Sequence, residues 1–540
     1  MVLTSPRGQR ELVTDFIFAM LLGIGGGAVF AILAVGLVIA YRGSGVINFS
    51  HGAIAMYVGL TFNQIRLDPG LGGSGDIYLP WVDIIPEWGW LRALRLNNLP
   101  VRITLGDAPL GTTFAVIVGL GMAALIGVMA HFLVFRPLRD ASPLSKVIGS
   151  VGIMIYLQAI AFVHFGTTAR RDPGWGVFNR DQDPIENFLG LGNTFPQGNL
   201  WLLAAGTVVV VVIWSLVRFS RFGLAARAVD ENERGMALLG YSADAIAGTT
   251  WVISAVLAGI VGMIYVPFTQ PANMTLLVVP ALGAALVGNL TSITGAALGG
   301  LGIAMIQSGG VWMAGRDWWP DWAPAGGVRQ VVPLLIVTII LFWRGDRLPV
   351  RGSRVVRGEP RAPVPQDPRR MLAIGLAVVA FLVLVGGWQI DTGLTTTLVA
   401  GIFMLSLVVL VGFLGQISLA QWSLAGLAAF LMIRLSADGT AIRSTDQLVN
   451  GGPGLPDPLA ALLAIAIVVI VGIVIGLPAV RVRGFQLAVI SITAVIAIED
   501  LLLANVSLMG PGAISNNPAP IPEWFGVYVG APQQIATDDG

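Results

Sequence analysis

The chain has 540 residues, of which 55% are hydrophobic and only 11% are charged. Soluble globular proteins carry about 25% charged residues, so this composition excludes that class. The net charge of +1 argues against a nucleic-acid partner, and the absence of cysteine excludes disulfides and thiolate metal sites.

Apolar segments long enough to cross a bilayer recur along the whole chain. A hydrocarbon core of about 30 Å needs about 20 predominantly apolar residues in a helix. The sequence therefore predicts an all-α polytopic membrane protein with about 12–14 membrane segments. They cover residues 16–41, 46–63, 111–135, 147–165, 200–218, 245–266, 276–308, 329–344, 371–388, 393–412, 415–434, 459–478 and 485–508.

Two of these segments carry signs of a broken helix. The run 276–308 is too long for one ordinary span and holds GNLTSITG in its middle, so we expect two shorter helices with a break between them. The dodecapeptide YRGSGVINFSHG, residues 41–52, interrupts the first apolar stretch with polar residues and glycines. Backbone that leaves the helix at membrane depth must be buried in protein or face a cavity.

Four basic loops set the predicted topology. Arginine and lysine gather at 136–146, 218–234, 344–370 and 481–483, which the positive-inside rule places in the cytoplasm. The numbers of predicted crossings between these loops are even, provided that 276–308 crosses twice and 415–434 crosses once.

The arginine- and proline-rich stretch 344–370 predicts a semi-rigid cytoplasmic linker. It separates a first unit, residues 1–343, from a second unit, residues 371–540.

The two units share a weak internal repeat. Setting Gly45 against Gly415 pairs Asn48 with Ser418 and His51 with Gln421, so that polar residues fall on polar residues. A basic turn followed by an apolar helix also recurs, at 135–158 and 479–499. Internal repetition of this kind is typical of transporters, whose pathway lies at the interface between repeats.

At these residues the sequence resembles the permease subunits of bacterial ABC importers for branched-chain amino acids. Unit one resembles the first permease type through INFSHGAIAMYVG (47–59), RFSRFGLAARAVDENERGMALLGYSADAI (218–246) and ALVGNLTSITGAALGGLGIAMIQ (285–307). Unit two resembles the second type through 412–430 and 477–503. The resemblance implies an ABC importer transmembrane-domain fold and a fusion of two permease types.

The block 218–246 resembles the family's coupling helix, which docks into a groove on the ATPase. Its composition predicts a short amphipathic helix that ends at Gly240, and an ordinary solvated loop helix is the alternative. The expected coupling residues are Arg227, Ala228, Asp230, Glu231, Leu239 and Gly240. In unit one this block follows the basic turn along the chain. The same number of residues counted from the basic turn of unit two ends beyond residue 540, so we expect unit two to be incomplete or completed by a further permease chain.

Polar residues near the two interruptions are the candidate lining of the translocation pathway. Amide side chains offer both donors and acceptors, which suits transient contact with a zwitterion. Hydrogen bonding between buried helices is the alternative. The candidates are Asn48, Ser50, His51, Gln158, Gln416, Ser418, Gln421, Trp422 and Glu499. Glu499 stands out because carboxylates inside an apolar run are costly and suggest function by default.

The sequence predicts a transporter subunit rather than an enzyme. Lys146 is its only lysine and is followed by Val147, so no phosphate-binding GK[ST] motif can form. No catalytic cluster or metal site is expected, and the chain itself is expected to bind no cofactor. ATP-Mg would then bind partner ATPases.

The resemblance implies two ABC ATPase subunits, an extracytoplasmic substrate-binding protein and surrounding membrane lipid as partners, in the bacterial plasma (inner) membrane. Branched-chain amino acids are the leading substrate class. Urea or short amides are the alternative within the family, and a secondary transporter or channel is the alternative from another class.

Overall fold

The computed structural model describes residues 6–81, 101–106, 108–139, 141, 143–166, 184–186, 194–265, 271–320, 325–344, 367–385, 388–413, 418–436, 442–444, 447–449, 453–477, 486–503, 523–524 and 527–528. Contacts divide the chain into two compact units. The first comprises Met1–Arg351, Arg443–Val449 and Ile496–Asn517, and the second comprises the remaining segments. The change at Arg351 falls inside the predicted linker, of which residues 345–366 lie outside the described part.

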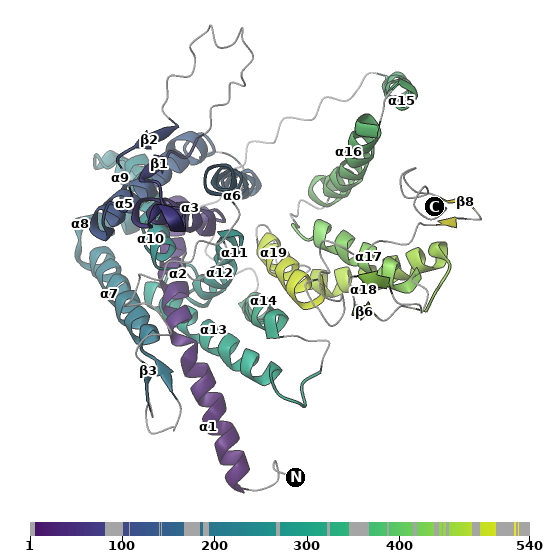
Figure 1. Ribbon diagram of the computed structural model, residues 1–540. Coiled ribbons are helices and arrows are strands. Elements are labelled where there is room, and N and C mark those ends of the chain that lie inside the picture. The colour runs from purple at the N-terminus through teal and green to yellow at the C-terminus, as the bar shows by residue number, and fades with distance from the viewer. Residues whose placement is uncertain are drawn as a thin grey trace. The chain divides into compact units, whose positions relative to one another are not determined.

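The first unit is a bundle of helices (Figure 1). Its helices are α1 (Pro6–Leu22), α2 (Ile24–Ser44), α3 (His51–Arg66), α5 (Thr112–Met129), α6 (Pro143–Phe165), α7 (Gln197–Phe219), α8 (Arg221–Glu231), α9 (Glu233–Leu238), α10 (Ala243–Tyr265), α11 (Pro271–Leu276), α12 (Val278–Val287), α13 (Ile293–Ala314) and α14 (Ala325–Arg344). The π-helical turns η3 (Ala130–Phe135) and η10 (Glu499–Leu503), the 3-10 turn η2 (Pro69–Leu71) and the strands β1 (Asp76–Tyr78), β2 (Arg102–Thr104), β3 (Pro184–Ile185) and β4 (Phe195–Pro196) complete it.

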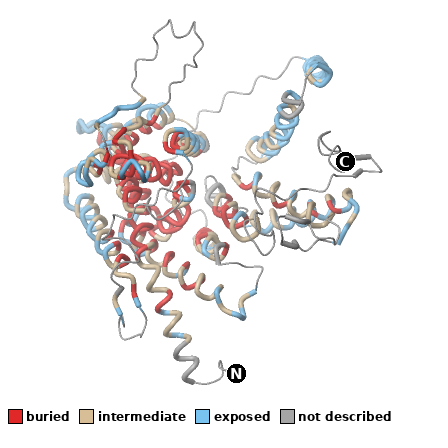
Figure 2. Tube along the Cα trace, in the orientation of Figure 1, coloured by how far each residue is buried: buried red, intermediate tan, exposed pale blue. Residues whose placement is uncertain are grey.

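Helix α2 lies at the centre of this bundle. It packs against α7, α10, α12 and α13, and 83% of its most apolar window is buried. A helix that is apolar on every side is stable only when it is surrounded by other apolar surface. Figure 2 shows buried residues concentrated around this helix and its neighbours α3, α10 and α12.

The second unit contains α15 (Pro368–Val385), α16 (Trp388–Leu407), α17 (Gln421–Ser436), α18 (Asp457–Gly476) and α19 (Gln486–Ile498), with the π-helical turn η8 (Val408–Phe413) and the short strands β5 (Ile442–Ser444), β6 (Gln447–Val449), β7 (Glu523–Trp524) and β8 (Val527–Tyr528). Strands β5 and β6 lie largely in the segment that contacts assign to the first unit. Helices α17 and α18 pack together. In contrast to α2, the apolar windows of α15 and of 393–413 have none of their residues buried.

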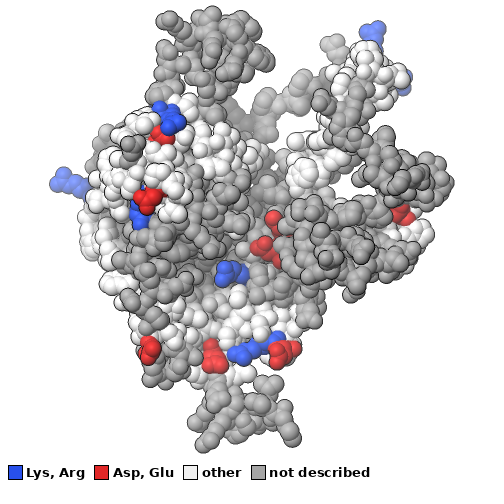
Figure 3. All heavy atoms as spheres, in the orientation of Figure 1, with Lys and Arg blue, Asp and Glu red and all other residues white. Residues whose placement is uncertain are grey.

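The all-α polytopic prediction is confirmed. Nine helices within the described residues are long and apolar enough to cross a membrane, and three shorter apolar helices accompany them. Among the described residues on the face shown in Figure 3, charged side chains are few and stand in small groups between uncharged atoms.

The predicted break in 276–308 is confirmed as well. Helix α12 ends at Val287 and α13 begins at Ile293. Between them, Asn289 and Leu290 have positive φ angles of 56° and 55°, which helices do not adopt. Preceding this pair, the short helix α11 was not expected from the sequence.

The stretch 41–52 is also a broken helix, and the predicted span 46–63 begins later than expected. Gly45 has φ 68° and ends α2, with its N–H donating to the carbonyl of Tyr41 at 2.7 Å. The next five residues are buried but not helical, and α3 begins only at His51. A glycine is required at position 45 because this left-handed conformation is costly for other residues.

Candidate functional site

The corner between α7 and α8, which its basic residues predict to be cytoplasmic, is fixed by backbone and side-chain hydrogen bonds. The Ser220 hydroxyl accepts a hydrogen bond from the N–H of Gly223 at 3.1 Å and so caps α8. The guanidinium of Arg227 donates to the carbonyls of Gly223, Val217 and Arg218 at 3.2–3.4 Å. Arg227, predicted as a coupling residue, therefore holds this corner from within.

The expected single amphipathic helix is two helices. Asn232 separates α8 from α9 and accepts a hydrogen bond from the N–H of Gly235 at 2.9 Å through its side chain, which is the usual role of an N-terminal cap. At the other end of α9, Tyr241 N–H donates to Met236 and Gly240 N–H to Ala237. Gly240 has φ 84°, so these bonds form a Schellman ending and Gly240 terminates the helix as predicted.

The two short helices have an apolar underside and an apolar tip. The underside is a buried cluster of Ala225, Val229, Met236 and Ile246, against which Ala228 packs.

At the tip, Leu238 is 89% exposed and Leu239 is 73% exposed. Tyr241 beside them is 49% exposed. Large exposed apolar side chains on a charged cytoplasmic loop mark an interaction surface. We call Leu238, Leu239, Gly240 and Tyr241 the coupling tip.

Ion pairs join the helices on either side of the coupling tip to the preceding basic loop. Glu233 at the start of α9 pairs with Arg139. Asp244 at the start of α10 lies 3.2 Å from Arg136 Nε and 3.2 Å from His131 Nε2. Exposed ion pairs contribute little to stability, but these three contacts fix α9 and α10 against the end of the α5–η3 segment.

Buried contacts continue from this loop towards the polar break at 45–50. Phe135 of η3 stacks on Trp251 of α10 with ring centroids 4.1 Å apart. Both rings belong to a buried cluster that includes Val46, the first residue after the glycine that ends α2. The end of the α5–η3 segment, which the ion pairs link to α9 and α10, is thus packed against the polar break.

The polar break is a buried, locally hydrogen-bonded turn. Asn48 Oδ1 accepts hydrogen bonds from the N–H and the hydroxyl of Ser50, at 3.0 and 2.5 Å. His51 Nδ1 lies 3.3 Å from the hydroxyl of Ser254 on α10. Asn48 Nδ2 and His51 Nε2 are buried without a partner in this structure. Buried polar atoms in that condition are uncommon and need an explanation.

The same turn recurs in unit two at the positions that the repeat predicts. Ala420 N–H donates to Ser418 Oγ at 3.2 Å, as Ser50 N–H does to Asn48. Helix α17 begins at Gln421 and α3 begins at His51, the residue paired with it, and both helices have 16 residues. Leu419 N–H also donates to Ser491 Oγ of α19 at 2.9 Å.

The other predicted pathway residues lie in varied surroundings. Gln158 is half-buried on α6. Trp422 is 66% exposed and stacks on Phe403 with centroids 3.9 Å apart. Glu499 is exposed at the start of η10. Gln416 and the side chain of Asp230 lie outside the described residues. That the nine candidates line one pathway stays a prediction.

The sequence did not predict that Leu238 and Tyr241 are exposed at the coupling tip, nor that Glu233 pairs with Arg139. Asn232 followed three residues later by Gly235 is a readable capping signal, whereas side-chain exposure is set by the packing of α8 on α10. Within the described part of the chain, no group of three His, Asp or Glu side chains is placed to hold a metal ion.

These features define a polytopic helical permease: a bundle of apolar helices, two of which are broken, with exposed leucines on a loop that the basic residues predict to be cytoplasmic. Residues 19–341 match the family described as "Branched-chain amino acid transport system / permease component". The chain belongs to that family.

Curated relatives agree with this assignment. The chain is similar to the high-affinity branched-chain amino acid transport system permease protein LivH of Escherichia coli K12, with 26% identity over 56% of this chain and 87% of LivH. It is also similar to BraD of Pseudomonas aeruginosa, with 25% identity over 60% of this chain and 92% of BraD. A probable LivH permease from Methanocaldococcus jannaschii is 25% identical over 51% of this chain and 75% of its own length. No solved structure matches the chain.

Proposed function

We propose that the chain forms the translocation pathway of an ATP-driven importer for branched-chain amino acids in the bacterial inner membrane. Two ABC ATPase subunits would bind and hydrolyse ATP-Mg, and an extracytoplasmic binding protein would deliver substrate. The named relatives transport branched-chain amino acids, which supports this substrate class.

The observation that carries the proposal is the coupling tip. Two leucines on a rigid pair of short helices stand 89% and 73% exposed at a cytoplasmic corner. Apolar side chains presented in this way on a fixed scaffold suit docking into a groove of a partner protein. Neither a channel nor a secondary transporter requires such a surface.

The contacts between the tip and the polar break supply a mechanical route. Movement of α9 would be transmitted through Arg139–Glu233 and Arg136–Asp244 to η3, and from Phe135 and Trp251 to Val46. The break at 45–50 is one of the described parts of the central bundle without helical hydrogen bonds, so it can bend at lower cost than a continuous helix. ATP binding and hydrolysis would thereby shift the pathway between outward- and inward-facing states.

The test is reconstitution of the chain with its candidate ATPases and binding protein in liposomes. Leucine, isoleucine or valine should stimulate ATP hydrolysis when the binding protein is present. Stimulation by urea or short amides, but not by these amino acids, would make urea or short amides the substrate class instead. Uptake driven by a proton or sodium gradient without ATP would overturn the proposal in favour of a secondary transporter.

A further inference from the structure

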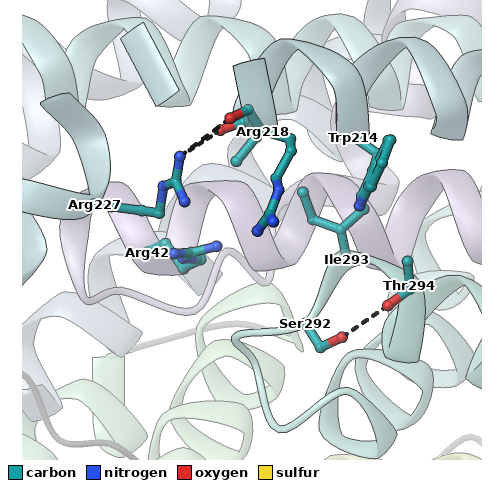
Figure 4. A pocket seen from close by; sticks show the side chains of 8 residues that line it. Arg42, Trp214, Arg218, Arg227, Ser292, Ile293 and Thr294 are labelled. Atoms are coloured by element: carbon teal, nitrogen blue, oxygen red, sulfur yellow. Dashed lines mark hydrogen bonds between the residues drawn. The ribbon is translucent and has the colours of Figure 1, made fainter. Parts of the chain in front are cut away.

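A basic cavity lies on the cytoplasmic side of unit one, beside the α7–α8 corner. Its walls come from the ends of α2 and α7, the middle of α8 and the N-terminus of α13 (Figure 4). The volume is about 150 Å³, enough for several water molecules or a phosphate group. Three guanidiniums line it, from Arg42, Arg218 and Arg227, and its described lining contains no carboxylate.

Backbone oxygens accept hydrogen bonds from two of the three arginines. Arg42 Nη1 donates to the carbonyl of Thr291 at 3.3 Å, and Arg227 donates to three carbonyls of the corner. Among the described residues, neither Arg218 nor Arg227 forms an ion pair with an acidic side chain. In Figure 4 the guanidinium of Arg218 extends into the space between Arg227 and Ile293, above Arg42. Within the described residues, the charges of Arg218 and Arg227 are therefore available to an anion.

The opposite wall is also suited to an anion. Ser292 caps the 22-residue helix α13, accepting from the N–H of Gly295 at 3.0 Å, and its hydroxyl lies 3.1 Å from that of Thr294. The N-terminus of a helix carries a partial positive charge and favours phosphate. Arginine forks bind phosphate oxygens in pairs, and the two hydroxyls add further donors.

The surface above the cavity favours a lipid rather than a soluble ion. Trp214 lines the cavity one turn before Arg218 on α7. The same helix face continues away from the cytoplasm through Val211 and Val208, which are 52% and 61% exposed. A tryptophan at the level of the headgroups with exposed aliphatic residues above it is the pattern of a lipid-facing membrane helix. Acyl chains can therefore lie along α7 while a headgroup phosphate occupies the cavity.

We propose that this cavity binds the headgroup phosphate of an anionic phospholipid from the cytoplasmic leaflet. Basic pockets between membrane helices on that side are the chemistry by which such lipids are recognised. The bound phosphate would bridge α2, α7 and α13 beside the corner that carries the coupling tip. The proposal does not depend on which substrate the permease transports.

The test is native mass spectrometry of the purified full-length chain with dioleoylphosphatidylglycerol or dioleoylphosphatidylcholine. The first phosphatidylglycerol should bind more tightly than phosphatidylcholine. Replacing both Arg42 and Arg218 by glutamine should weaken it by roughly thirtyfold, and each single replacement by roughly fivefold. Arg221→Gln is the matched control, since Arg221 lies on the same corner but outside the cavity lining, and it should change the affinity less than either single variant. The melting temperature shows whether each variant is folded. If the double variant is not folded, the two single variants still test the proposal.

Three outcomes would overturn the proposal. Equal loss in Arg221→Gln would show a diffuse surface attraction. Displacement of phosphatidylglycerol by millimolar inorganic phosphate would show a soluble-anion site, because acyl chains would then contribute nothing. Unchanged lipid affinity in the double variant, with loss of ATPase copurification, would assign the arginines to the partner protein.

Discussion

Replacing both tip leucines, Leu238→Ala and Leu239→Ala, should detach the permease from its ATPase without unfolding it. Fully burying one leucine side chain stabilises a complex by about 1.5–3 kcal/mol. Because Leu238 and Leu239 are 89% and 73% exposed, nearly all of that burial is still to be gained on docking. The double variant should then lose about 2–4 kcal/mol of docking free energy, or roughly 30- to 1,000-fold in affinity. The same exposure predicts little change in the permease's own stability.

The measurement is the dissociation constant between detergent-purified permease and ATPase, together with the melting temperature of the permease alone. Leu298→Ala on α13 is the matched control, since Leu298 is 68% exposed but lies outside the coupling tip. Undiminished ATPase affinity in the double variant would refute the docking surface. A fall in melting temperature as large as the loss of binding would show that the leucines stabilise the permease fold instead.

Three further changes test other parts of the structure. Gly240→Ala should reduce substrate-stimulated ATP hydrolysis more than Gly240→Asn, because a φ of 84° costs alanine about 1–2 kcal/mol while asparagine tolerates it. Equal activities of the two variants would contradict a conformational role for Gly240. Burial alone would raise the pKa of Asp76, but hydrogen bonds from Ser74, Arg102 and Thr104 and the Arg102 charge outweigh it and lower that pKa. Since the folded pKa is depressed, the stabilisation is present above the ordinary carboxyl value of about 4 and is lost as the pH falls through the folded pKa. Asp76→Asn should therefore destabilise the β1–β2 hairpin by about 1–2 kcal/mol. The difference in melting temperature between the wild-type protein and this variant should hold from neutral pH to about pH 5 and shrink below about pH 4. A difference that already shrinks above pH 5 would contradict the lowered pKa of Asp76. Glu499→Gln should lower uptake and alter its pH dependence. Asp500→Asn is the neighbouring control, because the Asp500 carboxylate accepts a hydrogen bond from Gln330. Unchanged uptake and pH dependence in Glu499→Gln would remove Glu499 from the pathway.

Hydropathy predicted most of the helices because a bilayer leaves the backbone few alternatives. The break between α12 and α13 could be predicted as well, since GNLTSITG places polar and small residues inside an otherwise continuous apolar run. The repeat paired Asn48 with Ser418, and these side chains close similar turns three residues before α3 and α17, although both helices begin later than the predicted spans.

The remaining features depend on packing that a single sequence does not reveal. Arg227 has the composition of a surface residue, yet its guanidinium turns inward to the backbone of α7. Leu238 and Leu239 differ from buried leucines only because α8 and α10 cover the opposite side of α9. The three-arginine cavity joins positions 42, 218, 227 and 292–294, which are too far apart in sequence for any motif to connect.

The central claim is that this permease carries branched-chain amino acids in a reaction driven by ATP on partner subunits. Uptake of radiolabelled leucine into proteoliposomes holding the permease and ATPases, with binding protein on the substrate side, tests it most directly. The account predicts leucine accumulation that requires ATP, is reduced by excess isoleucine or valine but not urea, and is abolished in the Leu238→Ala, Leu239→Ala variant. Accumulation without ATP, or undiminished in that variant, would contradict it.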